Sequence, residues 1–293
     1  MTIGLIGLGR MGMAIAQRLG ECGVTVTAWD RNGAATQAAA ALGIKTADGP
    51  QVVAAAADIV ISIITEDKGV RALFNGPGGV LGTDVNGKLF IEMSTLQPAT
   101  TRALAPAVEA KGARLVEAPV MGSIPTVRQG KLLVLAAGDA TDIQRASCVL
   151  DHLARRIVHM GPHGSALAMK LAVNVGMATY LQSIAEATAL GMAHGLTLEQ
   201  MLEILLEAPT ASPWLKAKLD VLKGGHDDVT LDIRTIRKDV MSAIATGALA
   251  GVPLPAAAGA LASLSAAVAA GWGEKDLAEV PRYFRDHLLQ VYD

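Results

Sequence analysis

A glycine-rich turn between two short apolar strands is the feature that most constrains how this chain can fold. Residues 2–6 form an apolar run that leads into a G-x-G-x-x-G turn, and after a helical stretch a second run, residues 24–29, ends at Asp30. In such a unit the first glycine permits a tight turn, the second lets the backbone approach a pyrophosphate, and the third lets the helix pack closely on the sheet. The helix N-terminus adds N–H groups and a partial positive charge for phosphate oxygens. The pattern predicts a dinucleotide site built from Gly7, Leu8, Gly9, Arg10, Met11 and Gly12.

The residues after the second strand bear on which nicotinamide dinucleotide is bound. Asp30 lies 23 positions after Gly7, where a carboxylate accepts hydrogen bonds from the ribose hydroxyls of NAD and repels the 2′-phosphate of NADP. Arg31 beside it could pair with that phosphate, stack on the adenine, or remain a solvated surface charge. Together with Asn32 these residues are expected at the cofactor. Asp30 favours NAD(H), and Arg31 leaves NADP(H) open.

Strands and helices alternate up to residue 160. Further strands are expected at residues 59–64, 89–92, 114–118, 131–137 and 156–160, with helical stretches between them. The alternation predicts a mostly parallel, doubly wound α/β sheet of the Rossmann type, which binds ligands beyond the carboxyl ends of its strands. We therefore expect Ile64, Thr65 and Thr95 along one crevice with the glycine-rich turn, and the segment 121–123 with them.

A long helix follows this alternation. Residues 165–193 read as one uninterrupted helix, about 43 Å long at roughly 1.5 Å per residue, and almost everything after it is helical. The chain is therefore expected to contain a dinucleotide-binding domain, residues 1–163, and an all-α domain, residues 164–293, joined by this helix. Within the second domain, Thr197 and Gln200 predict a capping box, and residues 272–277 are expected to precede the last helix.

Composition excludes several classes of function. The formal net charge is −2 and no basic tract is present, which argues against a nucleic-acid-binding protein. The stretch 243–272 carries no charge, but it is rich in Ala and Gly and contains Pro253 and Pro255, so we expect two close-packed helices rather than a membrane span. Two cysteines and a strand that begins at Thr2 predict a cytoplasmic protein without a disulfide framework or signal peptide.

Four stretches taken together resemble the β-hydroxyacid dehydrogenase family, which includes 3-hydroxyisobutyrate dehydrogenases and glyoxylate/succinic semialdehyde reductases. They are the glycine-rich turn, the segment from Glu117 to Ser123, the run 161–174, and the pair Lys238-Asp239. The motifs occur in the family's order and span essentially the whole chain. Residues 117–123 and 130–139 are similar to the glyoxylate reductase branch. The resemblance implies hydride transfer between a nicotinamide dinucleotide and a small carbonyl or hydroxy compound.

The resemblance also implies roles for the matching residues. Lys170 would be the catalytic acid/base, and Asn174 would orient it and the substrate. Thr95 would lie near nicotinamide and substrate, and Lys238 would close over the nicotinamide from the second domain. Donors to a substrate carboxylate would come from Gly122 and Ser123. The long helix is the family's usual dimerisation element, which implies a homodimer.

The sequence departs from the family pattern at three positions. Met121 stands where the family usually has a serine that helps to hold the carboxylate, Ala166 replaces a glycine, and Thr65 replaces a proline. Met121 matters most, because a soft apolar side chain favours a larger or less polar substrate. A methionine here also resembles the imine reductases, although those generally carry Asp or Tyr where this chain has Lys170.

Each candidate residue also has a structural interpretation. Lys170 shares a largely apolar helix face with Asn174, so burial would lower its pKa toward neutrality and suit it to proton transfer; alternatively its ammonium reaches water. Lys238 could belong to a solvated charged face. Ser94 or Thr95 could cap the helix that begins at Pro98. Ser123 could be structural in its turn. The six histidines form no recognisable metal-ligand set.

Three hypotheses follow. The first is an NAD(P)-dependent oxidoreductase that interconverts a small aldehyde or keto compound and its hydroxy product, with Lys170 as general acid/base. The second is a reductase or reductive aminase acting on C=N bonds. The third is a dinucleotide-binding protein that has lost catalysis, against which the presence of Lys170 and Asn174 argues.

Overall fold

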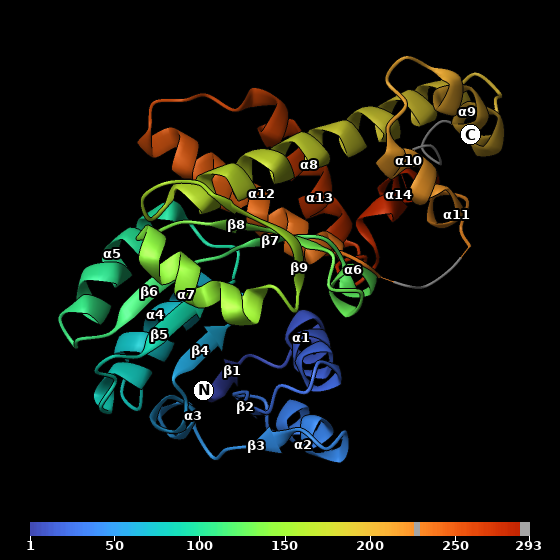
Figure 1. Ribbon diagram of the computed structural model, residues 1–293. Coiled ribbons are helices and arrows are strands. Elements are labelled where there is room, and N and C mark those ends of the chain that lie inside the picture. Colours follow the sequence, from blue (N-terminus) through green and yellow to red (C-terminus); the bar gives the residue numbers. More distant parts are fainter. Residues whose placement is uncertain (226–228, 288–293) are drawn as a thin grey trace. The chain divides into compact units, whose positions relative to one another are not determined.

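The computed structural model describes residues 1–225 and 229–287 and divides into two compact units, Met1–Lys170 and Leu171–Asp293. The first unit alternates strands and helices, and the second is helical (Figure 1). The long helix α8 (Ser165–Met192) begins in the first unit and continues into the second. This confirms the predicted α/β Rossmann-type sheet followed by a helical part with a long helix between them.

Strands and helices alternate along most of the first unit. In chain order they are β1 (Ile3–Ile6), α1 (Arg10–Glu21), β2 (Val26–Trp29), α2 (Gly33–Ala41), β3 (Lys45–Thr46), α3 (Pro50–Ala56), β4 (Ile59–Ser62), α4 (Asp67–Asn75), β5 (Leu89–Glu92), α5 (Pro98–Glu109), β6 (Arg114–Glu117), β7 (Val120–Met121), α6 (Ile124–Arg128), β8 (Leu132–Ala136), α7 (Ala140–Leu150) and β9 (Ala154–His159).

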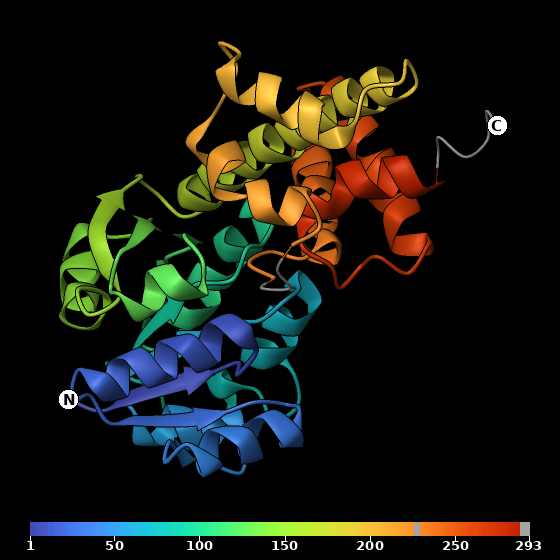
Figure 2. The same cartoon turned by 90° about the vertical axis from the view of Figure 1, so that its right-hand side faces the viewer.

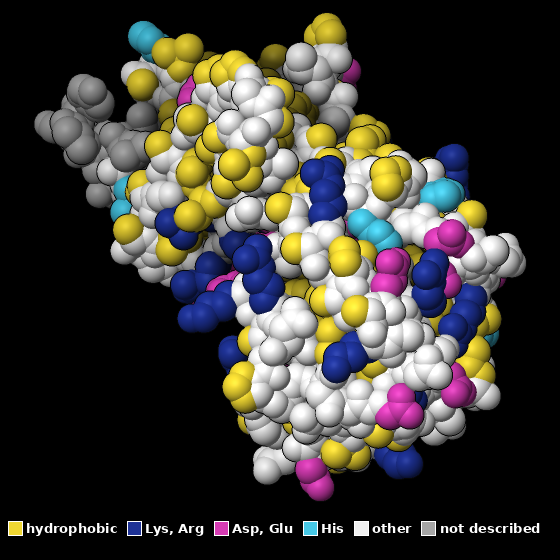
Figure 3. Space-filling view, turned by 90° about the vertical axis from the view of Figure 1, so that its left-hand side faces the viewer, with side chains coloured by type: hydrophobic (Ala, Val, Ile, Leu, Met, Phe, Trp, Pro, Cys, Tyr) yellow, Lys and Arg dark blue, Asp and Glu magenta, His cyan; other side chains and the backbone are white. Residues whose placement is uncertain are grey.

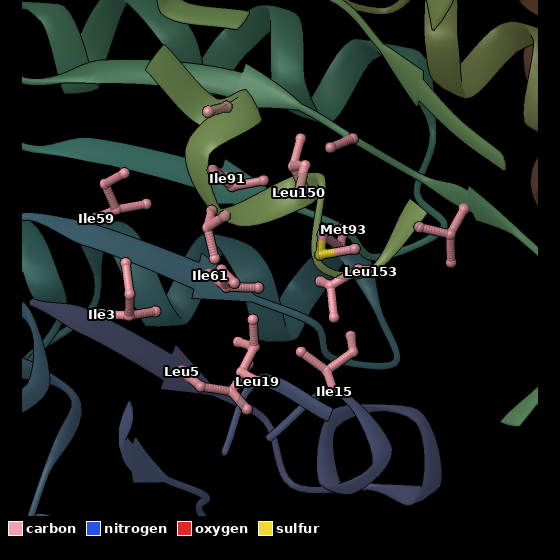
Figure 4. Close-up of a cluster of buried hydrophobic side chains, with 14 of the residues drawn as sticks. Ile3, Leu5, Ile15, Leu19, Ile59, Ile61, Ile91, Met93, Leu150 and Leu153 are labelled. Atoms are coloured by element: carbon pink, nitrogen blue, oxygen red, sulfur yellow. The ribbon is translucent and has the colours of Figure 1, made fainter. Parts of the chain in front are cut away.

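A six-stranded parallel sheet forms the centre of the first unit. Its strand order is β3-β2-β1-β4-β5-β6. Alternate residues of the central strands enter two separate apolar cores, one against α1 and α7 and the other against α3, α4 and α5. Figure 4 shows the first core, where Ile15 and Leu19 of α1 approach Leu5 and Ile61 of the strands. In Figure 2, α1 lies along one face of the sheet. Because both faces are covered, the central strands β1, β4 and β5 are buried along their whole length, and apart from Ser62 and Glu92 at their ends they are apolar rather than alternating.

The sequence interpretation was wrong about the last two strands of this unit. Residues 131–137 and 156–160 were expected to extend the main sheet, but β8 and β9 form a separate three-stranded sheet with β7, in the order β7-β8-β9. The connection from β7 to β8 contains only the short helix α6, and a parallel crossover needs about a dozen residues or more. β7 therefore pairs antiparallel with β8, and only β9, reached through α7, lies parallel to it.

The second unit is built around the later part of α8. Its other helices are α9 (Leu198–Glu207), α10 (Pro213–Ala217), α11 (Leu219–Leu222), α12 (Ile233–Leu249), α13 (Pro255–Ala269) and α14 (Val280–His287). The predicted capping box is present, since Thr197 and Gln200 exchange side-chain and backbone hydrogen bonds at the start of α9. The last helix is α14, and residues 272–277 precede it, as predicted. Trp272 and Leu277 of this segment pack into the core of the second unit.

The uncharged stretch 243–272 lies in two packed helices, as predicted. It covers the end of α12 and all of α13, whose small side chains share one apolar core with Ala178, Leu181 and Ala185 of α8. Among the described residues no helix is long and apolar enough to cross a membrane. On the face shown in Figure 3, basic and acidic side chains are interspersed over the first unit.

Candidate functional site

The predicted cofactor residues of the first unit follow four neighbouring parallel strands. The glycine-rich turn follows β1, Asp30 follows β2, Ile64 and Thr65 follow β4, and Thr95 follows β5. Strands β2, β1, β4 and β5 are adjacent in that order and run parallel. Their carboxyl ends therefore lie along one edge of the sheet, the edge at which such sheets bind ligands.

The glycine-rich turn needs glycine at two positions for steric reasons. Gly7 has a φ of +104°, and a Cβ there would lie 2.1 Å from the carbonyl oxygen of Ile63. A Cβ on Gly12 would lie 1.9 Å from the carbonyl oxygen of Gly7. A Cβ on Gly9, in contrast, would meet no atom within 4 Å. Gly7 and Gly12 are thus required by packing, whereas the space beside Gly9 suits a close ligand.

The start of α1 fits a pyrophosphate. Gly9 is the N-cap residue and offers no side chain to the first-turn N–H groups, and the first turn contains no acidic residue. Such a helix end favours a bound anion. The residues that would hold the phosphates are the six of the turn, Gly7 to Gly12.

Asp30, at the end of the neighbouring strand β2, stabilises the glycine-rich turn through hydrogen bonds. Its Oδ2 accepts a hydrogen bond from the Leu8 N–H at 2.7 Å, and its Oδ1 accepts one from the Asn32 N–H at 2.7 Å. Asn32 in turn caps α2 by accepting from the Ala34 N–H. Arg31 is exposed. The carboxylate that was predicted to face the ribose therefore also organises the turn.

The segment 121–123 belongs to the second sheet of the same unit. Met121 ends β7 and packs against an apolar cluster that includes Leu135 and Ala166. Gly122 has a φ of +139°, and a Cβ there would lie 2.7 Å from a Leu132 methyl group. The Ser123 hydroxyl lies 3.1 Å from that of Thr126, a contact within the turn itself.

Asn174 and Lys238 are brought together in the second unit by a buried carboxylate. Asn174 Nδ2 donates to Asp239 Oδ2 at 2.7 Å, and Lys238 Nζ lies 2.8 Å from Asp239 Oδ1. Asn174 and Asp239 are each 2% exposed. Lys238 is thus paired with a buried carboxylate, and its side chain is 24% exposed. Sequence reasoning gave Asp239 no role of its own; its signal was an acid adjacent to Lys238.

Lys170 is partly exposed and lies on α8 one helical turn before Asn174. It is the last residue of the first unit, and Asn174 lies in the second. Residues four apart on a helix share a face, so the two side chains project from the same side of α8.

Two buried carboxyl groups that sequence reasoning left without a role lie at the ends of neighbouring strands in the first unit. Glu92 and Glu117 end β5 and β6, pair in register, and are 0% exposed. Glu92 accepts from the Ser62 hydroxyl at 2.5 Å and from the Ser94 N–H at 2.7 Å. The Ser94 hydroxyl accepts from the Ile64 N–H at 2.8 Å. Glu92 thereby fixes the turn that carries Thr95.

Capping was the wrong interpretation for Ser94 and Thr95. The N-cap residue of α5 is Gln97, and its N–H donates to Asp67 Oδ1 at 3.0 Å. Ser94 instead connects the ends of β4 and β5 through its hydrogen bonds to Ile64 and Glu92.

Glu92 is expected to make stability depend on pH. Burial, with a smaller contribution from the nearby Glu117, raises the pKa of Glu92 to about 7 although hydrogen bonds from Ser62 and Ser94 oppose the shift. The folded protein therefore binds a proton that the unfolded chain releases between about pH 4.5 and 7. The free energy of unfolding should therefore fall by about 3 kcal/mol as pH rises through this window. Urea unfolding of Glu92→Gln should show a flatter pH dependence between pH 5 and 8.

The matched control for this prediction is Glu203→Gln, which removes an exposed carboxyl group on α9. Its pH dependence of the unfolding free energy should follow that of the wild type. Equal pH slopes for Glu92→Gln and the wild type would show that Glu92 does not hold the proton.

Two family models match the chain in succession. The NAD binding domain of 6-phosphogluconate dehydrogenase matches residues 2–161, and the NAD-binding domain of NADP-dependent 3-hydroxyisobutyrate dehydrogenase matches residues 164–284. In solved structures, 3-hydroxyisobutyrate dehydrogenase of Salmonella typhimurium has a TM-score of 0.84 at 25% identity, with 97% of this chain and 99% of that chain covered. A reductive aminase of Aspergillus terreus, in complex with NADPH and ethyl levulinate, has a TM-score of 0.64 at 25% identity, with the same coverage of the two chains.

Curated relatives agree with these matches. The 2-(hydroxymethyl)glutarate dehydrogenase of Eubacterium barkeri is 32% identical over 96% of this chain and 93% of its own length. The cytokine-like nuclear factor N-PAC of Homo sapiens is 31% identical over 96% of this chain, which spans about half (51%) of that relative's length. One family model covers more than half of the chain, and a dehydrogenase of this type is similar over nearly its full length. The chain therefore belongs to the β-hydroxyacid dehydrogenase family, as its motifs predicted.

Proposed function

We propose that this protein is an NAD(P)-dependent oxidoreductase that interconverts a small aldehyde or keto compound and its hydroxy product, with Lys170 as general acid/base. The observation that carries the proposal is the arrangement on α8. Lys170 lies one turn before Asn174, and Asn174 is held by the buried carboxylate of Asp239. A lysine one helical turn from an amide of fixed orientation, in a chain with a glycine-rich turn suited to a dinucleotide, supplies the groups that carbonyl reduction needs.

The chemistry divides between cofactor and protein. A bound nicotinamide dinucleotide supplies the hydride to the carbonyl carbon, or accepts it in the reverse direction. The carbonyl oxygen must then gain a proton, which the Lys170 ammonium donates; in the oxidative direction the neutral amine takes the proton back. Before that transfer, the ammonium also stabilises negative charge developing on the oxygen.

Asn174 acts as a positioning group in this scheme. Its Nδ2 donates to Asp239, which fixes the orientation of the amide. The amide oxygen is then directed away from Asp239 and accepts a hydrogen bond from the Lys170 ammonium or the substrate hydroxyl. Because Asp239 also pairs with Lys238, one carboxylate orders both residues of the second unit that were predicted at the site.

The cofactor proposal favours NAD(H). Asp30 places a carboxylate at the end of β2, where a 2′-phosphate would be repelled. Arg31 is exposed beside it and keeps NADP(H) open, since a guanidinium pairs well with a phosphate. Thr65, Thr95 and Lys238 are proposed to contact the nicotinamide half.

The substrate pocket is proposed around Met121, Gly122, Ser123 and Thr95. Met121 contributes an apolar surface at the position where a hydroxyl group would bind a substrate carboxylate, so we expect a less polar or larger substrate than a small hydroxy acid.

Reduction of C=N bonds is the alternative, supported by the likeness to a reductive aminase, although the TM-score of that structure is lower than that of the 3-hydroxyisobutyrate dehydrogenase. A non-catalytic role is the third candidate, because the relatives called nuclear factors carry no enzyme name. A homodimer formed through α8 and a cytoplasmic location remain predictions.

A substrate panel tests the proposal. Purified protein is assayed with small aldehydes, keto acids and cyclic imines, each with NADH and with NADPH, by following absorbance of the reduced nicotinamide. We expect turnover of at least one carbonyl compound and a higher kcat/KM with NADH. Turnover of imines alone would replace the proposal with its alternative. Dinucleotide binding without turnover of any compound would favour the non-catalytic role.

A further inference from the structure

Glu117 is a carboxylate at the end of β6 with three hydrogen-bond donors and no exposure to solvent. Its Oε2 accepts from the Gly164 N–H at 2.6 Å, and its Oε1 accepts from the Leu167 N–H at 2.7 Å. The Thr101 hydroxyl donates to Oε2 as well. Because Glu117 is 0% exposed, it cannot touch substrate or cofactor from solvent, and its role must lie in what it holds.

What Glu117 holds is the first turn of α8. Gly164 immediately precedes this helix and Leu167 is its third residue, so both N–H groups belong to the set that a helix leaves without internal partners. A carboxylate at this end is also stabilised by the positive end of the helix dipole. Glu117 therefore performs the task of an N-cap side chain, from a strand 47 and 50 positions earlier in the chain.

The anchored turn leads directly to Lys170. Leu167 precedes Lys170 by three residues, which is about 4.5 Å along a helix axis and less than one turn. Leu167 is itself fully buried in the core with Phe90 and Leu115, and Ala166 is buried against Leu135. The start of α8 is thus fixed both by packing and by one carboxylate, within the same unit that ends at Lys170.

We propose that Glu117 is a positioning residue for Lys170: its carboxylate fixes the first turn of α8 and so sets the position and the charge environment of the Lys170 amine. This inference rests on the proposed function, because it assumes that Lys170 transfers the proton. We expect the negative charge of Glu117 to favour the ammonium form of the Lys170 amine, and the pH profile of the test variant measures this effect.

The test variant is Glu117→Gln, which keeps the size of the side chain. It removes the negative charge and replaces one acceptor oxygen by an NH2 group that faces a backbone N–H. We expect kcat for carbonyl reduction to fall by about tenfold to a hundredfold, since a small misplacement of a reacting group has effects of this size. The alkaline limb of the kcat–pH profile should move to lower pH by roughly 0.5 to 1 unit, because an ammonium without its nearby anion loses its proton more readily. The Kd for the dinucleotide should stay within about twofold of the wild type.

Hydrogen–deuterium exchange gives a readout that does not depend on turnover. Amides of residues 164–170 should exchange faster in Glu117→Gln than in the wild type, because two of them lose a charged acceptor. Glu117→Asp retains the charge with a shorter reach. It should restore the position of the alkaline limb but only part of kcat, and it serves as the test variant if Glu117→Gln does not fold.

Thr101→Val is the matched control. It removes the third hydrogen bond to the same carboxylate and leaves its charge and both helix contacts in place. We expect a lower Tm, with the pH limb and the exchange of residues 164–170 unchanged. If Thr101→Val shifts the pH limb as much as Glu117→Gln does, Glu117 serves stability alone and the inference is wrong.

The outcomes separate this inference from the proposed function. If the wild type shows no turnover and Lys170→Ala changes nothing, the proposed function fails, whatever the exchange experiment shows. If the wild type is active and Lys170→Ala is inactive, but Glu117→Gln matches the wild type in pH limb and first-turn exchange, then only the positioning role of Glu117 is overturned.

Discussion

Replacing Lys170 with Ala should lower kcat for carbonyl reduction by roughly a hundredfold to ten thousandfold, the range over which a positioned acid/base contributes. The substitution removes the only group that we assign to protonating the carbonyl oxygen. Binding of the dinucleotide should be nearly unchanged, because the turn proposed to hold the phosphates lies at the start of α1. Single-turnover kinetics measure the chemical step, and calorimetric titration measures the dinucleotide Kd.

Lys216→Ala is the control for this prediction. Lys216 is an exposed lysine on the short helix α10, so its loss should leave kcat and Kd as in the wild type. A Lys170→Ala protein that keeps the wild-type kcat would remove Lys170 from the mechanism. A Lys170→Ala protein that loses dinucleotide affinity as well as turnover would assign Lys170 to binding.

The second large effect is expected at Gly9. A Cβ at this position meets no protein atom within 4 Å, so Gly9→Ala should fold, with an unfolding free energy within about 1 kcal/mol of the wild type. The added methyl group would occupy the space through which a pyrophosphate approaches the backbone. We therefore expect the dinucleotide Kd to rise by about tenfold or more, measured by calorimetric titration.

Gly12→Ala provides the contrasting case on the same turn. Its Cβ would lie 1.9 Å from the carbonyl oxygen of Gly7, so the backbone must shift and stability should fall by roughly 3 kcal/mol or more. Gly20→Ala, later in α1, has open space and should be neutral or slightly stabilising. If Gly9→Ala binds dinucleotide as tightly as the wild type, the phosphates do not lie against this turn.

Much of the fold was predictable because local patterns and global architecture agree. Apolar strands bounded by helical stretches predicted the parallel sheet, and the uninterrupted run after Gly164 predicted α8 to within one residue of its end at Met192. The second sheet was not predictable in the same way. The strands β8 and β9 look like further parallel strands in sequence, and only the short connection through α6 shows that β8 must pair with β7.

The supporting residues of the site were harder to find than the residues proposed to act there. Glu92 and Glu117 end apolar strands, and an acid in that position ordinarily reaches solvent. Their burial depends on partners far away in sequence, such as Gly164 and Leu167 for Glu117. Asp239 is similar, because its contact with Asn174 spans 65 positions. Sequence patterns identify side chains that are able to take part in a reaction, whereas the contacts that orient these side chains depend on tertiary structure.

The two hydrogen bonds of Asp30 have a consequence for attempts to redesign coenzyme preference. Exchanging Asp30 for a neutral residue would remove the repulsion of a 2′-phosphate, but it would also release the Leu8 and Asn32 amides that this carboxylate holds. A switch toward the phosphorylated coenzyme by one substitution would therefore loosen the loop that we propose to bind either coenzyme. Natural or engineered conversion of this protein needs a second, compensating change that restores an acceptor for the Leu8 amide.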